Sequence, residues 1–257
     1  MNQFIIFFNK ENKEMVRNFK WIWMPLLFIL LGMIQPVTTY NMPKIIDSIG
    51  NLPKGAIVEI PTPTASEVLF GTVSQQFNMI GILVIVLAFM ASVPGERNNG
   101  SAALVLVKPV SIQSYLLAKW LSALLLVWVS YIFGMLANWY YTYQLFELVN
   151  FDLMVKGLMI YGLWITFITT LIFFFGSMMK SSGLTAAFTL IVTIVLSFLS
   201  NIIQKEWLPA KLIHYTGELW STTALPQGTT SAITVTLATI FILIVSALII
   251  FRSKELL

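Results

Sequence analysis

The chain has 257 residues, of which 58% are hydrophobic and 10% are charged, and its net charge is +4. Soluble domains usually carry about one charged residue in four, so this composition excludes an ordinary water-soluble domain. The low charge and the aromatic content also exclude a disordered chain. The sequence therefore predicts an all-α, polytopic membrane protein.

Six apolar stretches are long enough to cross a bilayer as helices, which requires roughly 20 residues each. We place the membrane spans at residues 21–40, 77–93, 115–140, 153–175, 184–203 and 232–251. The second span is short, and residues 73–76 can extend it. Pro36 is expected to kink or end the first span. Two longer segments, residues 41–72 and 204–231, then lie together on one side of the membrane.

The basic residues divide unevenly between the two sides of these spans. The side with both termini and residues 94–114 and 176–183 holds ten Lys and Arg against four acidic residues, whereas the other side holds five against seven. Cytoplasmic segments are enriched in Lys and Arg, so both termini are expected in the cytoplasm, with the chain in the plasma membrane. Lys119, just inside the third span, is expected to extend to the headgroup layer.

Residues 1–20 contain an amphipathic pattern from Phe4 onward. The basic side chains fall within an arc of about 80° on a helical wheel, opposite a cluster of apolar side chains; these bases are Lys10, Lys13, Arg17 and Lys20. Such a helix is expected in the headgroup plane, with its bases toward anionic lipid or a cytoplasmic partner. An ordinary positively charged flank needs neither partner, and the pattern leaves these alternatives open.

The connector over residues 94–114 is longer than most connections, which have about 4–6 residues. Pro94 and Gly95 end the second span, and Glu96 follows where a helix N-terminus favours an anion. Lys108 and Pro109 are expected to end a short helix, after which Ser111 caps the third span. Because the connector also carries an apolar run that includes Leu104, a docking element is favoured over a plain linker.

Several kinds of chemistry have no motif in this sequence. A P-loop, a Gly-x-Ser-x-Gly nucleophile motif and a His-Glu-x-x-His zinc motif are all missing. The predicted spans contain no Asp or Glu, and His214, the only histidine, cannot form a two-histidine metal site. We therefore expect no catalytic, cofactor-binding or metal residues, no nucleic-acid partner and no enzymatic activity in this chain. For His214 a packing or surface role is favoured.

The order of a basic amphipathic segment, two spans, Glu96-Arg97-x-x-Gly100 and Lys108-Pro109-x-Ser111 resembles the type-2 class of bacterial ABC exporter permeases. The turn at residues 176–182 is similar to the corresponding turn in that class. The resemblance implies a coupling helix after the second span that sits on an ATPase. Its residues in this chain are Glu96, Arg97, Gly100, Leu104, Lys108, Pro109 and Ser111.

The resemblance also implies partners. Two six-span permease subunits, identical or different, associate with separate cytoplasmic ATPase subunits that hold the ATP and Mg. Spans rich in Phe, Leu, Ile and Met with scattered Ser and Thr fit an amphipathic or hydrophobic cargo, such as an antimicrobial peptide, a drug or a lipid. A non-transporting scaffold or sensor that recruits a cytoplasmic partner is the alternative, and an enzyme acting within the bilayer is third. The long segment 41–72 departs from a simple connector and has no assigned role.

Overall fold

The computed structural model describes residues 3–49, 63–99, 111–146, 149–203 and 205–255. Within these ranges the secondary structure is helical, without strands, which confirms the predicted all-α class. In chain order the elements are α1 (Gln3–Arg17), α2 (Lys20–Ile49), α3 (Ala65–Gly71), the π-helix η1 (Thr72–Gly81), α4 (Ile82–Phe89), α5 (Pro94–Asn98), α7 (Ile112–Leu145), α8 (Phe151–Met178), α9 (Ser182–Ile202), α10 (Lys211–Thr222) and α11 (Thr229–Glu255).

Six segments of the described chain are long and apolar enough to cross a membrane, and each overlaps one predicted span. Five of them differ from the predicted spans mainly at their ends. The second runs over Ala65–Asn98 and combines α3, η1, α4 and α5, so it begins well before residue 77. Thr64 and Glu67 form a capping box that starts the helix there.

Polar residues along the second span are paired with other helices. Thr72 donates a hydrogen bond to Asn138 Oδ1 of α7 at 2.8 Å, and Asn78 Oδ1 accepts one from the Trp164 indole of α8 at 3.1 Å. These polar groups therefore remain satisfied inside the bundle, where no water is needed to solvate them.

The first span is also longer than predicted, because α2 does not end at Pro36. The helix continues through Pro36 and Pro43 to Ile49, so the start of the predicted segment 41–72 is helical. The other long segment, residues 204–231, contains the short helix α10, which packs on α8 and α3.

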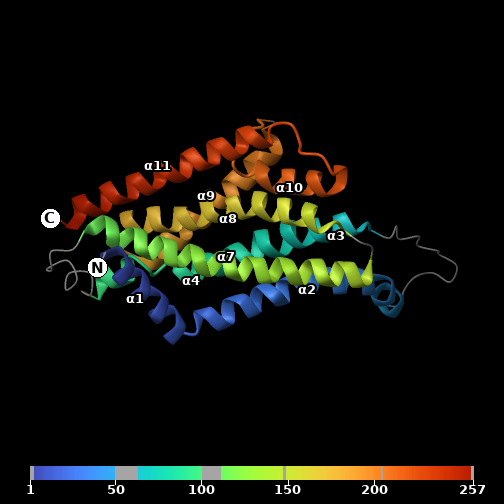
Figure 1. The fold of residues 1–257 in the computed structure, drawn as a ribbon, viewed down its shortest axis with the longest axis horizontal. Coiled ribbons are helices and arrows are strands. Elements are labelled where there is room, and N and C mark those ends of the chain that lie inside the picture. Colours follow the sequence, from blue (N-terminus) through green and yellow to red (C-terminus); the bar gives the residue numbers. More distant parts are fainter. Residues whose placement is uncertain (1–2, 50–62, 100–110, 147–148, 204, 256–257) are drawn as a thin grey trace.

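Glycines allow a close helix contact between α2 and α7. A Cβ atom added to Gly32 would lie 2.2 Å from the Gly134 carbonyl oxygen, so no larger residue fits without moving a backbone. Small residues are the usual means of close helix packing in membranes. In Figure 1, α7 and α8 run along the middle of the bundle between α2 and α11.

The bundle has two ends, which are called the α1 end and the α10 end after a helix that lies at each. At the α1 end lie α1, α5, the start of α7 and the end of α11; at the α10 end lie α3, α10 and the start of α8 (Figure 1). α1 packs obliquely against α7 and ends at Arg17 rather than at Lys20. Phe19 adopts a left-handed backbone conformation with φ of 56° and turns the chain into α2, so Lys20 belongs to the first span.

Candidate functional site

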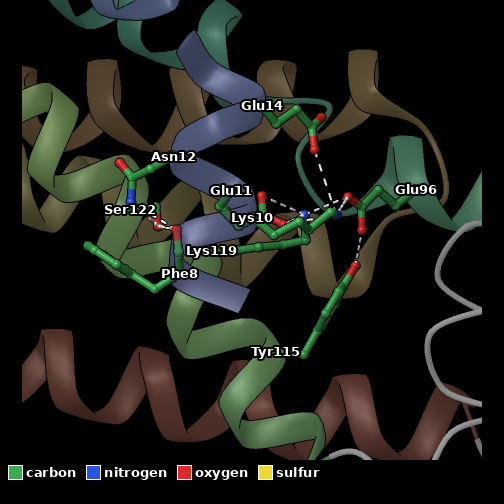
Figure 2. A network of polar contacts seen from close by, with 9 residues as sticks. All are labelled: Phe8, Lys10, Glu11, Asn12, Glu14, Glu96, Tyr115, Lys119 and Ser122. Carbon is green, nitrogen blue, oxygen red and sulfur yellow. Dashed lines mark hydrogen bonds and ion pairs between the residues drawn. The ribbon is translucent and has the colours of Figure 1, made fainter. Parts of the chain in front are cut away.

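A buried ion cluster joins three elements at the α1 end. Lys119 of α7 has an exposed side-chain fraction of 3%, and its Nζ lies 2.9 Å from each carboxylate oxygen of Glu11 in α1. The same Nζ lies 2.7 Å from Glu96 Oε1 in α5. The expectation that Lys119 extends to the headgroup layer is wrong, because two carboxylates hold it inside the protein (Figure 2).

Two further side chains complete the contacts of Glu96. Tyr115, one turn before Lys119 on α7, donates a hydrogen bond to Glu96 Oε2. Lys10 Nζ lies 3.0 Å from Glu96 Oε1 and 3.2 Å from Glu11 Oε1, and it also pairs with Glu14 at 3.7 Å. Burial alone lowers the pKa of Lys10, but attraction to Glu11 and Glu96 outweighs it and raises the pKa overall.

The cluster can be buried because its positive and negative charges nearly balance and its charged side chains are paired with one another. Removing charged groups from water costs several kcal/mol for each ion unless partners compensate them. A small cavity of about 220 Å³ adjoins the cluster between α1 and α4, with Glu11, Lys20, Phe89, Ser92 and Lys119 among its lining residues. That volume is large enough for several waters.

Three carboxylates in the cluster lie close enough together to suggest a cation site. Ligand oxygens of Glu11, Glu14 and Glu96 lie within 4.8 Å of one another. However, the ammonium groups of Lys10 and Lys119 already contact these carboxylates (Figure 2). The arrangement is therefore that of an ion-pair network between helices, and we assign no metal to it.

The next two residues of α5 contact the remaining spans. Arg97 donates to the Ser177 carbonyl at the end of α8 at 3.1 Å, and its guanidinium lies 5.1 Å from the ring centre of Phe251 in α11. Asn98 donates to the Lys180 carbonyl, in the turn between α8 and α9, at 2.9 Å. The five-residue helix α5 is thus bonded to α1, α7, α8, α11 and the turn before α9.

Phe251 brings the last span into the same assembly. Its side chain is fully buried and stacks on the Tyr115 ring with centroids 5.7 Å apart. Since Tyr115 also bonds Glu96, the end of α11 contacts both α5 and the α7 residue that holds α5.

The sequence-predicted coupling residues fall into two groups. Glu96 and Arg97 lie in α5, and Ser111 accepts a hydrogen bond from Ser114 N as the cap of α7. The Ser111 amide also donates to Gln3 of α1 at 2.9 Å. The other predicted residues lie outside the described part of the chain: Gly100, Leu104, Lys108 and Pro109.

The four predicted bases of the amphipathic segment also separate. Lys10 enters the ion cluster, and Lys20 donates to the Ala88 carbonyl at 2.7 Å. Lys13 and Arg17 are exposed on α1. The bases predicted to share one face therefore separate into two that contact the protein and two that are exposed.

Sequence reasoning did not identify Glu11, Tyr115 or Phe251 as site residues, and it misassigned Lys119. One signal was available: Tyr115 and Lys119 are four residues apart and therefore share one face of α7. Nothing local indicated Glu11 or Phe251, because each joins the cluster only after distant segments pack together.

His214 lies on α10, far from this site. It lines a cavity of about 280 Å³ with Phe70, Glu67 and Glu218. Burial lowers the pKa of His214, and Lys211 lowers it further against an opposing effect of Glu218. The imidazole is thus partly buried at the α10 end, and its packing or surface role stays a prediction.

Comparison with known proteins places nearly the whole chain in a family of membrane transporter proteins. Residues 5–256 match the ABC-2 family transporter protein family. A relative from Bacillus subtilis (strain 168), named an uncharacterized transmembrane protein YxlG, is 35% identical over 205 residues, which cover 79% of each chain. The chain therefore belongs to the ABC-2 transporter permease family, whose members are non-catalytic membrane subunits of ABC transporters.

Proposed function

We propose that this chain forms half of the membrane path of an ATP-driven exporter and that α5, with the segment that follows it, receives the motion of a separate ATPase. The α1 end then faces the cytoplasm, in keeping with its basic residues. A second permease subunit completes the path, and ATP and Mg bind to the ATPase.

The contacts of α5 are the observation that carries this proposal. A helix of five residues is too short to be stable alone, yet its polar side chains bond five other segments. A push on α5 is therefore transmitted to α1 and α7 through Glu96, and to α8 and α11 through Arg97. Packed interfaces of this kind shift between discrete arrangements rather than deforming continuously.

Two of the spans that α5 contacts, α7 and α11, expose mostly apolar side chains. This composition supports an amphipathic or hydrophobic cargo such as an antimicrobial peptide, a drug or a lipid. Export of such compounds from the bilayer needs no charged binding site within the spans, in keeping with the sequence.

Purification of the full chain from native membranes tests the proposal. We expect a P-loop ATPase to accompany it in a fixed ratio and the complex to move cargo only with ATP. A partner without nucleotide chemistry would instead favour the membrane scaffold or sensor. Cargo movement by the chain alone, without any ATPase, would overturn the exporter assignment.

A further inference from the structure

The bases of α1 and the lysine that begins α2 differ in what they contact. Lys10 and Lys20 are bonded within the protein, to the ion cluster and to the Ala88 carbonyl. Lys13 and Arg17 are one turn apart on the outward side, and no carboxylate in the described chain forms an ion pair with either. Two positive charges therefore lie adjacent and uncompensated on this surface.

Both acids of α1 are paired with lysines. Glu11 is buried against Lys119, and Glu14 pairs with Lys10. A shallow groove of about 800 Å³ follows the outward side; besides Lys13 and Arg17 it is lined by Ile6, Asn9, Lys10, Glu14 and Asn18. Three cations and one carboxylate thus border the groove, which favours an anion.

Exposed apolar side chains stand beside and after these charges along the chain. Val16 and Phe19 have exposed fractions of 57% and 66%, and the exposed surface continues onto α2 with Ile22 and Trp23. Such a surface is unfavourable in water, but acyl chains cover the exposed face of a membrane-spanning helix such as α2. Tryptophan is also enriched at the boundary between acyl chains and headgroups.

We propose that Lys13 and Arg17 bind the phosphate of an anionic phospholipid whose acyl chains lie along Phe19, Ile22 and Trp23. An Arg guanidinium can bind two phosphate oxygens at once, and Lys13 adds a second charge one turn away. The exposed apolar side chains at the end of α1 and the start of α2 favour a lipid over an acidic protein surface. The inference does not depend on the ATPase.

The test uses the purified full chain in neutral detergent, titrated with short-chain phosphatidylglycerol or phosphatidylcholine and read by native mass spectrometry. A basic residue at a membrane surface contributes about a fivefold gain in anionic lipid affinity. We therefore expect the double variant Lys13→Gln/Arg17→Gln to bind phosphatidylglycerol about 25-fold more weakly. Phosphatidylcholine binding should not change.

The control is Lys205→Gln/Lys211→Gln, which removes the same charge at the α10 end and should leave the strongest phosphatidylglycerol binding unchanged. Thermal unfolding of both double variants in neutral detergent shows whether the fold is intact. Wild-type phosphatidylglycerol affinity in Lys13→Gln/Arg17→Gln would overturn the proposal. So would equal competition by inorganic phosphate, which would indicate a site for free anions. Loss of a bound partner protein with unchanged lipid affinity would assign the surface to that partner.

Discussion

The α1 end and the α10 end of the bundle are joined by different kinds of contact. At the α1 end, Lys119 bonds carboxylates from two other elements and is almost fully buried. At the α10 end, the ion pair between Lys156 and Asp152 lies within α8, at 2.6 Å, and both side chains are more than half exposed. The first pair connects helices, whereas the second stabilises only the helix that carries it.

Uncharged contacts hold the α10 end together instead. The Trp220 indole of α10 donates to the Leu153 carbonyl of α8 at 2.9 Å, and the Ser66 hydroxyl of α3 donates to the Trp220 carbonyl at 2.8 Å. Close packing fixes one relative position of these helices. At the α1 end the ion pairs are buried, and a cavity adjoins them into which their side chains have room to move. The α1 end is therefore the better candidate for a moving joint.

Lys119→Met should have the largest effect on folding. It leaves Glu11 and Glu96 without their buried partner, and breaking such a pair costs about 3–5 kcal/mol. Thermal unfolding in detergent should show a large loss of stability, which the double variant Glu11→Gln/Lys119→Met should partly restore. If Lys119→Met unfolds like the wild type, the ion cluster does not hold the α1 end together.

Gly157→Ala tests the packing of the α10 end, again by thermal unfolding in detergent. An added Cβ atom would lie 2.4 Å from the Trp220 indole, and overpacking of this kind typically costs about 1–3 kcal/mol. Gly183→Ala is the matched control, because the nearest atom to its added Cβ is Ser181 Oγ at 3.7 Å. Equal unfolding temperatures for the two variants would show that Trp220 does not fix α10 on α8.

Lys156→Met should have a much smaller effect than Lys119→Met, although both replace a paired lysine with the same residue. Exposed ion pairs contribute at most about 1 kcal/mol. The two variants are best compared side by side in the same unfolding experiment. A loss for Lys156→Met as large as that for Lys119→Met would remove the proposed difference between the two ends.

Mild acid should produce the smallest change, at the α10 end. The pKa of His214 is lowered from 6.5 by burial and by Lys211, so the unfolded chain binds this proton more readily than the folded one. Stability from the neutral imidazole is present above pH 6.5 and is lost as the pH falls through the lowered pKa. Hydrogen exchange of α10 should rise in mild acid, and His214→Gln should abolish this rise; a rise that persists in the variant would have another origin.

The spans were predictable from sequence because apolar length is a local property. The second span was the exception, since its start at Ala65 depends on polar residues such as Thr72, whose partner on α7 is known only from the fold. Pro36 does not end the first span, because α2 continues past it.

The site was predictable only in part. Glu96 and Arg97 follow a local pattern, the break after the second span. Their partners do not: Glu11 and Lys119 are 108 positions apart in sequence, and the pairing depends on how α1 folds back on α7. Amphipathicity placed four bases on one face, but only tertiary contacts separate Lys10 and Lys20 from Lys13 and Arg17.

The most direct test of coupling through α5 is cargo transport per ATP hydrolysed by the intact permease–ATPase complex carrying Glu96→Gln. Glutamine keeps the size of the side chain but removes its charge and replaces one of its two acceptor oxygens with a donor, and a hydrogen bond to a charged group contributes about 1.5–3 kcal/mol. We expect the complex to assemble and hydrolyse ATP while transport per ATP falls about tenfold or more, with Asp152→Asn at the wild-type value. Wild-type transport per ATP in Glu96→Gln would contradict the role of α5 as the joint between ATPase and spans.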